Sequence, residues 1–301
     1  MLYKWGVIGH ETQLSALEND IKSGNLAHAY LFSGPEKVGK FTVAKKLAHI
    51  LQCPDNYCYT CNVCKQIEKG GHSDTIQLRG DDEAIKIEQI RDIIARLNMT
   101  ANSNHKIVLA EDIERMTPEA ANCLLKTLEE PPPKVVFICT TTNIREVLPT
   151  IVSRMRVLRF RNFSEKFLIN AMTKEFPDTD TEAIEQVCSL AMGKSGQAFK
   201  LLRDGELLSH YRTLYNDILR LLETETVSER FSYIQGIYED PKLTRDFLDV
   251  LLHVLRSRML SEHNIDRNKL MKDITAVQNT SSFLKKNINV RLSLENLFLS
   301  L

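Results

Sequence analysis

The chain has 301 residues, of which 43% are hydrophobic and 26% are charged, and it contains only 12 glycines and 9 prolines. This length exceeds what one hydrophobic core usually organises, and the composition excludes disordered and low-complexity chains, so two or three folded domains are expected. The 39 basic side chains equal the 39 acidic ones in number, which excludes a protein that holds nucleic acid by bulk positive charge.

The first structural signal is a short apolar run at residues 27–33 that stops at Gly34. Its length and the glycine that follows predict a buried strand, and a helix is predicted from about Lys40. The segment at 34–40, Gly-Pro-Glu-Lys-Val-Gly-Lys, has the pattern of a phosphate-binding loop. In such a loop, backbone N–H groups and a helix N-terminus surround a phosphate, and a lysine reaches its outer oxygens. Gly34, Gly39 and Lys40 are therefore candidate nucleotide-binding residues.

The residue after this lysine is unusual for a metal-dependent nucleotide enzyme. That position normally carries the hydroxyl that binds Mg²⁺, but here it is Phe41. A hydroxyl occurs one position later, at Thr42, which lies roughly 100° further round a helix. Binding of ATP with Mg²⁺ at Lys40 and Thr42 therefore stays open, a scaffold turn is the alternative, and intrinsic hydrolysis is not expected.

Four of the seven cysteines, Cys53, Cys58, Cys61 and Cys64, lie close together in the sequence. The spacing C-x4-C-x2-C-x2-C allows four thiolates to surround one Zn²⁺ in a closed, structural site. Reduced free thiols and a redox pair are the alternatives, and His72 is either a substitute ligand or an ordinary loop histidine. A secreted disulfide framework would spread its cysteines along the chain. Since the sequence also offers no apolar signal segment, we expect a cytoplasmic protein without membrane contact.

Four further runs have the length and the β-branched or aromatic content of strands. They lie at 75–78, 106–110, 135–140 and 157–160. A helix is predicted between the second and the third, because Thr117 can cap its start, Pro118 suits its first position and prolines follow at 131–133. Strands that alternate with helices predict an α/β domain with a parallel, helix-covered sheet.

Two acidic residues, Glu111 and Asp112, follow the predicted strand at 106–110. In nucleotide hydrolases, a carboxylate pair at such a strand end holds Mg²⁺ and orients the attacking water. Here the longer side chain stands at the metal-binding position and the shorter one at the water-orienting position. Each carboxylate is therefore displaced by about one C–C bond from its usual place, a shift to which catalysis is sensitive. The pair is a candidate cofactor site, and two solvated charges at a strand end are the alternative.

An arginine-rich stretch begins at Arg154, directly after Ser153. A guanidinium fixed at this corner between a helix and a strand can reach the nucleotide of a neighbouring subunit and neutralise charge on its γ-phosphate. Arg154 is therefore the candidate catalytic residue. The other arginines, Arg156, Arg159 and Arg161, are expected on a solvated strand edge.

After about residue 161, the strand signal ends and apolar positions recur at helical spacing. We expect an α/β domain at 1–161 that includes the cysteine segment at 53–64, a small helical lid at 162–208 and a helical domain at 209–301. The last domain has broad apolar stripes that suit packing against other helices, so it is expected to form an oligomerisation collar.

Several motifs together closely resemble the clamp-loader branch of the AAA+ family. They are His-Ala-Tyr-Leu-Phe-Ser-Gly-Pro at 28–35, the cysteine segment, Met-Thr-Pro-Glu-Ala-Ala-Asn-Cys-Leu-Leu-Lys-Thr-Leu-Glu-Glu-Pro-Pro at 116–132 and Leu-Pro-Thr-Ile-Val-Ser-Arg at 148–154. The resemblance implies an AAA+ P-loop-like domain in a five-subunit ring with a C-terminal collar. The implied partners are the gamma/tau and delta subunits of DNA polymerase III, with the sliding clamp and primed DNA reached through the assembly. It also implies that Arg154, in the place of the family's Ser-Arg-Cys motif, is an arginine finger for a neighbouring ATPase subunit.

Three positions depart from the pattern of the active ATPases in that family. Phe41 replaces the hydroxyl residue, Glu111 and Asp112 reverse the acidic order, and Gln197 stands where an arginine is expected near the start of the last lid helix. The resemblance therefore implies a stator subunit that assists ATP turnover without performing it. A gamma/tau-type ATPase motor is the alternative, and a zinc-containing nucleic-acid module, which the zero net charge weakens, is a third.

Overall fold

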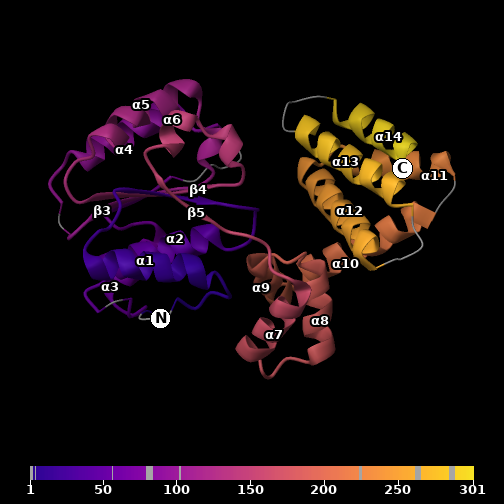
Figure 1. Ribbon diagram of the computed structural model, residues 1–301, viewed down its shortest axis with the longest axis horizontal. Coiled ribbons are helices and arrows are strands. Elements are labelled where there is room, and N and C mark those ends of the chain that lie inside the picture. Colours follow the sequence, from indigo (N-terminus) through magenta and orange to yellow (C-terminus); the bar gives the residue numbers. More distant parts are fainter. Residues whose placement is uncertain are drawn as a thin grey trace. The chain divides into compact units, whose positions relative to one another are not determined.

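The computed structural model describes residues 3, 5–55, 57–78, 84–101, 103–223, 226–261, 266–284 and 289–301 (Figure 1). Contacts within the chain group it into two compact units. The first comprises Met1–Glu175 with Gly193–Gln197, and the second comprises Phe176–Met192 with Ala198–Leu301. Within the described ranges, no helix combines the length and the apolar character needed to span a membrane.

A five-stranded sheet forms the centre of the first unit, with the strand order β2-β3-β4-β1-β5 and parallel pairing between neighbours. The strands are β1 (Ala29–Ser33), β2 (Thr75–Leu78), β3 (Lys106–Ala110), β4 (Val135–Thr141) and β5 (Arg156–Arg159). The predicted parallel α/β sheet is thereby confirmed; β2 and β3 coincide with the predicted runs, and the other strands differ from theirs by one or two residues at an end. For example, β1 begins at Ala29 rather than at residue 27.

Side chains that alternate along the strands contribute to two hydrophobic cores, one on each face of the sheet. Leu31 and Phe137 lie in one core, whereas Tyr30 and Ile138 lie in the other, and all four are buried. The first core is completed by α4 (Ile87–Leu97), α5 (Pro118–Glu129) and α6 (Pro149–Val152), and the second by α1 (Glu11–Ser23) and α2 (Lys40–Gln52). Figure 1 shows these two groups of helices on opposite faces of the sheet. Burial on both faces explains why β1, β3 and β4, which are buried throughout, are nearly continuous apolar runs in the sequence.

Helix α5 begins and ends where the local sequence predicts. The side chain of Thr117 accepts a hydrogen bond from the backbone N–H of Ala120, with 3.2 Å between N and Oγ1, and Pro118 is the first helical residue. The helix ends at Glu129, before the prolines at 131–133, which cannot continue it.

The second unit is built from helices in the part of the chain that the structure describes. They are α8 (Thr181–Leu190), most of α9 (Ser195–Arg203), α10 (Gly205–Glu223), α11 (Val227–Ile237), α12 (Pro241–Ser261), α13 (Arg267–Leu284) and α14 (Val290–Ser300). The apolar positions that predicted stripes on α10 and α12 include Tyr211 and Phe247, which are buried, and the Tyr211 hydroxyl donates to Asp246 Oδ1 at 2.7 Å. Helix α10 passes without a break through residue 208, where the lid is expected to end, so the domain boundaries stay a prediction.

We expect Thr117→Ala to lower the free energy of unfolding of the first unit by about 1 kcal/mol, because the N–H of Ala120 loses its capping acceptor. Denaturant unfolding followed by circular dichroism measures this change. Thr117→Ser keeps a hydroxyl oxygen and is the matched control, which should retain most of the stability. Equal loss in both variants would contradict the capping role.

Candidate functional site

The glycine loop at 34–40 lies where β1 passes into α2, as the sequence predicts. Gly39 has a left-handed backbone, with φ of 98°, directly before Lys40, the first helical residue. The ammonium of Lys40, which is buried, donates to the carbonyl oxygens of Gly34 and Pro35, each 2.7 Å away. A Cβ at Gly34 would lie 2.3 Å from the carbonyl oxygen of Phe160, so only glycine allows this close approach. The loop is thus fixed against the chain that follows β5.

Two segments distant in sequence hold the other side of this loop. The backbone N–H of Gln197 donates to the carbonyl oxygen of Lys37, and the Ser195 hydroxyl donates to the carbonyl oxygen of Val38. The donor and acceptor atoms are 3.1 Å apart in both hydrogen bonds. His10 Nε2 lies 2.9 Å from the same Val38 oxygen. Burial lowers the pKa of His10, and a neutral ring protonated at Nε2 satisfies this contact.

Sequence reasoning did not select His10, Ser195 or Gly196 as site residues. The sequence does contain an indication for Gly196, because small residues at 193–196 interrupt a helical pattern. The structure gives the reason for the glycine, since a Cβ at Gly196 would lie 2.6 Å from the carbonyl oxygen of Lys37. His10 offers no such signal, since its partner is remote in the sequence and only the fold brings the two together.

Glu111 and Asp112 directly follow β3, and the structure brings them near Lys40 at the carboxyl end of the sheet. Burial lowers the pKa of Lys40, and these two carboxylates oppose that shift, Asp112 more strongly than Glu111. Burial in turn raises the pKa of Asp112, and the nearby carboxylate of Glu114 adds to this effect. Asp112 has a left-handed φ of 50°, and its backbone N–H donates to Thr140 Oγ1 at 3.2 Å. The acidic pair is therefore positioned by the backbone and is partly withdrawn from solvent.

These groups fit a phosphate better than they fit a Mg²⁺ ion. Backbone N–H groups at the start of α2 and the ammonium of Lys40 are the donors that a phosphate requires. Phe41, which is half-buried, supplies no oxygen, and Thr42 is exposed and lines a cavity beside the cysteine segment. The chain thus offers residues to hold a phosphate, whereas the usual hydroxyl ligand of Mg²⁺ is missing from its position.

Arg154 lies at the corner between α6 and β5 and is held by groups of its own chain. Its Nη2 donates to Glu129 Oε1 at 2.5 Å, and its Nη1 donates to the carbonyl oxygen of Thr150 at 2.9 Å. About a third of the side chain, 34%, is exposed to solvent. The pairing with Glu129, at the end of α5, is another contact that sequence reasoning missed.

The register of the sheet separates Arg154 from the glycine loop. Tyr30 of β1 lies opposite Arg156 of β5 in a parallel pair, so the start of β5 lies beside the start of β1. Arg154 precedes β5, whereas Gly34 follows β1, so the two residues lie toward opposite ends of the sheet. Arg154 is thus directed by the fold to a different end of the sheet from the glycine loop of its own chain.

The neighbouring arginines Arg156, Arg159 and Arg161 are exposed, as expected, but Arg156 is more than a solvated edge residue. Its guanidinium pairs with the buried carboxylate of Asp20 on α1, and that carboxylate also accepts a hydrogen bond of 2.8 Å from the Tyr30 hydroxyl. This network ties the edge strand to α1. Strand alternation alone could not indicate it, because the partner comes from a helix far away in the sequence.

The four cysteines of the predicted zinc segment come together between α2 and α3 (Asn62–Lys69). Their sulfur atoms all lie within 4.8 Å of one another, and Cys53 Sγ is 3.8 Å from the Sγ atoms of both Cys58 and Cys61. These separations are too long for disulfides but match the roughly 3.8 Å edge of a tetrahedron with metal–sulfur distances of about 2.3 Å. The donor set and its geometry fit Zn²⁺, and His72 lies outside this group.

The thiols of this group differ in acidity. Hydrogen bonds from the Thr60 side chain and from the backbone of Cys61 lower the pKa of Cys58 to about 6, whereas burial raises the pKa of Cys64 to about 12. A thiolate is thus present at neutral pH for a first metal–sulfur bond. Closing the site requires Cys64 to lose its proton, which a bound metal favours.

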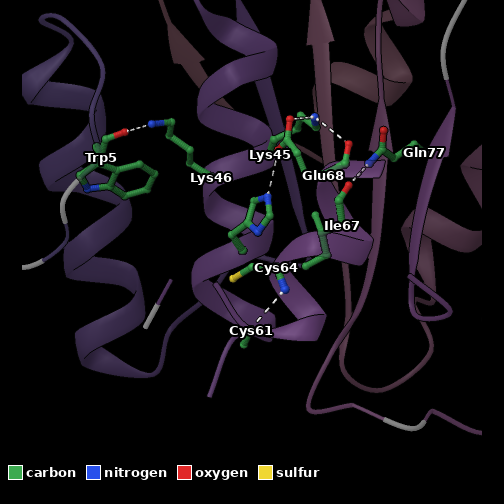
Figure 2. A network of polar contacts seen from close by, with 9 residues as sticks. Trp5, Lys45, Lys46, Cys61, Cys64, Ile67, Glu68 and Gln77 are labelled. Carbon is green, nitrogen blue, oxygen red and sulfur yellow. Dashed lines mark hydrogen bonds and ion pairs between the residues drawn. The ribbon is translucent and has the colours of Figure 1, made fainter. Parts of the chain in front are cut away.

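Polar contacts fasten the cysteine segment to the rest of the first unit (Figure 2). Lys45 Nζ of α2 donates to Glu68 Oε1 of α3 at 2.9 Å, and Glu68 Oε2 lies 3.4 Å from His49 Nε2. From β2, the Gln77 side chain donates to the carbonyl oxygen of Ile67 at 2.8 Å. These contacts join α3 to both α2 and the sheet, and none of them involves a thiol.

Comparison with known proteins supports the same fold and family. The family model described as "DNA polymerase III, delta subunit" matches residues 9–164, which is more than half of the chain. The gamma subunit of DNA polymerase III from Buchnera aphidicola subsp. Acyrthosiphon pisum is 31% identical, over 76% of this chain and 65% of the relative. The delta' subunit from Bacillus subtilis is 27% identical, over 96% of this chain and 94% of the relative.

Other relatives show how this chain compares in length and in fold. It spans 65%, 58% and 36% of three gamma and tau relatives, and therefore less than two thirds of each. A solved structure of a gamma-subunit-related protein from Thermotoga maritima is 21% identical, with a TM-score of 0.50, over 94% of this chain and 97% of the other. This likeness shows the fold alone. By the span of its family match, the chain belongs to the DNA polymerase III delta-subunit family of clamp-loader subunits.

Proposed function

We propose that the chain acts as the delta' subunit of a bacterial clamp loader and donates Arg154 to the ATPase site of a neighbouring subunit. In this role it works in the cytoplasm, within a hetero-pentamer with gamma/tau and delta subunits, which loads the sliding clamp onto primed DNA during replication. The match to a delta' relative along almost the full length of both chains supports this assignment.

The separation of Arg154 from its own glycine loop is the observation that carries the proposal. An arginine that is held in place, partly exposed and toward the opposite end of the sheet from its own loop is better placed for the nucleotide of another subunit than for one in its own chain. Arginine fingers act from an adjacent subunit by stabilising charge on the transferred phosphoryl group. The hydrogen bonds from Arg154 to Glu129 and to Thr150 limit the conformations it can adopt, which supports such a role.

The same chain is proposed to have little or no ATP turnover of its own. The hydroxyl ligand of Mg²⁺ is replaced by Phe41, and Lys40 donates to carbonyl oxygens of its own loop. Gln197 stands where the resemblance implies an arginine; it is 1% exposed, and its side-chain amide makes no hydrogen bond within the described structure. Gly34, Gly39 and Lys40 would hold the phosphates of a bound nucleotide, and Thr42, Glu111 and Asp112 are the nearby oxygen donors.

A gamma/tau-type ATPase motor is the second candidate. Its support is the higher sequence identity to a gamma relative, 31% against 27% for the delta' relative. In the motor, Lys40 would bind a nucleotide that is hydrolysed in this chain's own loop. In the delta' subunit, Arg154 would act on a nucleotide that is hydrolysed in a neighbouring subunit.

Each region of the chain is assigned a separate role. We propose that residues 1–161 form the AAA+ domain, that 162–208 form a lid and that 209–301 form the collar through which subunits assemble. Zn²⁺ bound by Cys53, Cys58, Cys61 and Cys64 is proposed to be structural, because four protein ligands leave no open position for substrate.

Arg154→Ala is expected to slow ATP turnover at the neighbouring site about 1,000-fold or more in a clamp loader reconstituted with gamma/tau and delta subunits, clamp and primed DNA. Arg154→Lys should also be slow, since lysine keeps the charge but loses the planar fork of donors. Light scattering should report normal assembly for both variants. Arg159→Ala removes another exposed arginine of the same region and is the matched control, which should keep full turnover.

The isolated chain is expected to show negligible ATP hydrolysis, and Lys40→Ala should leave turnover of the reconstituted assembly largely unchanged. Steady hydrolysis by the isolated chain, abolished by Lys40→Ala, would instead establish the motor function. Unchanged turnover of the assembly with Arg154→Ala would remove the arginine-finger role.

Metal analysis of protein purified without chelator is expected to give one zinc per chain, and Cys61→Ser should reduce this value. Hydrogen exchange should then speed up in α3 far more than in the sheet, because Cys64 lies in α3 whereas no strand of the sheet carries a ligand of the metal. Cys123→Ser, which alters a cysteine outside the group, is the matched control. Substoichiometric zinc in the unaltered chain would contradict the proposed site.

A further inference from the structure

A cavity of about 690 Å³ lies along α2, between that helix, the cysteine segment and α3. Its volume is in the range of roughly 300–1,000 Å³ that is typical of ligand-binding pockets. Its lining includes four lysines and two tyrosines, which are Lys45, Lys46, Lys65, Lys69, Tyr57 and Tyr59. Neither the zinc site nor the arginine finger explains why lysines and aromatic rings gather here.

The charges around the cavity are unevenly distributed. Four lining residues are lysines and two are glutamates, and one of these, Glu68, is already paired with Lys45 at 2.9 Å. Lys65 and Lys69 are exposed and lie one helical turn apart on α3, so both ammonium groups are carried on the same helix face. The cavity therefore has an excess of positive charge on its α3 side, although the chain as a whole is neutral.

Aromatic rings form a stack beside these lysines. The ring of His49 stacks on Tyr57, with centroids 4.6 Å apart and an interplanar angle of 24°, and Tyr57 contacts Tyr59, with centroids 3.7 Å apart. Tyr59 ends the stack and is 52% exposed. Lys46, whose ammonium donates to the carbonyl oxygen of Trp5 (Figure 2), lies 5.8 Å from the Tyr57 ring centroid.

The backbone holds both tyrosines in a conformation that large side chains rarely adopt. Tyr57 has φ of 73° and Tyr59 has φ of 64°, both in the left-handed region. Such conformations are uncommon outside glycine, asparagine and aspartate, and they persist only where the surroundings enforce them. The backbone at Tyr59 thus sets the direction in which its side chain leaves the chain.

We propose that this cavity binds single-stranded nucleic acid, with a base stacked on Tyr59 and backbone phosphates at Lys65 and Lys69. Aromatic platforms beside a cationic surface are the combination that binds single strands without sequence preference. An acidic peptide would use the same lysines but would gain no stacking from the rings, so the observations favour a nucleic acid. The site goes beyond the arginine-finger function and contains neither Arg154 nor Lys40.

The test measures binding of a fluorescent oligothymidine of roughly ten nucleotides to the full chain by anisotropy, a length within the usual site sizes of single-strand binding folds. Tyr59→Ala is expected to weaken binding about five- to 100-fold, the range found when one stacking platform is removed. Tyr59→Phe keeps the ring and should bind like the unaltered chain. Equal affinity of the alanine variant and the unaltered chain would overturn the stacking role.

The lysines are tested by a charge-reversal pair. Lys65→Glu with Lys69→Glu should weaken binding and reduce the slope of log affinity against log salt concentration by about 1.4, since each phosphate contact on a single strand contributes about 0.7. Lys22→Glu with Lys166→Glu makes the same charge change at exposed lysines of the first unit outside the cavity. If both pairs weaken binding equally, the effect is one of net charge and the proposal is wrong.

A polyglutamate peptide serves as the competing probe. If it binds as tightly as the oligonucleotide, and loses affinity with the Lys65 and Lys69 pair but not with Tyr59→Ala, the cavity is a peptide site and the proposal is overturned. Zinc content and thermal unfolding verify the fold of each variant. Should Tyr59→Ala not fold, the charge-reversal pair, on an exposed helix face, decides the outcome. Because Arg154 plays no part in this assay, a negative result would leave the proposed arginine-finger function unaffected.

Discussion

The hydrogen bonds to the carbonyl oxygens of Lys37 and Val38 are the constraint on which the shape of the glycine loop depends. His10 and Ser195 satisfy the Val38 oxygen, and the backbone of Gln197 satisfies the Lys37 oxygen. A buried carbonyl that loses its partner costs about 1–3 kcal/mol. The loop therefore keeps its shape only while the start of α1 and the start of α9 remain against it.

This arrangement explains how the loop can keep its shape without a bound nucleotide. The loop is held by protein groups on its outer side, and Lys40 finds acceptors within the loop itself. None of these contacts requires a bound nucleotide. Phosphate loops usually carry a hydroxyl residue at the position of Phe41, and that hydroxyl binds the metal ion. Phe41 is compatible with this fold, because the contacts described above hold the loop without such a hydroxyl.

The sequence allowed the sheet, its parallel pairing and the cysteine cluster to be predicted, because each of these depends on local patterns. Strand content and the capping residue Thr117 are local, and so is the spacing of four thiols. The contacts of Arg154 with Glu129 and of Arg156 with Asp20 could not be predicted, because each joins elements that only the fold brings together. The same is true of His10, whose position beside the loop depends on where α1 begins.

The strand order has a consequence for how the chain acquires its structure during synthesis. The first strand, β1, lies between β4 and β5, so Tyr30 gains both of its strand partners only after Ile138 and Arg156 have been synthesised. Pairings so distant in sequence close large loops and form slowly. The contacts of the glycine loop are completed later still, because its last partner is residue 197. A nascent chain that ends before β5 exposes an apolar strand with an unpaired edge, the kind of species on which chaperones act.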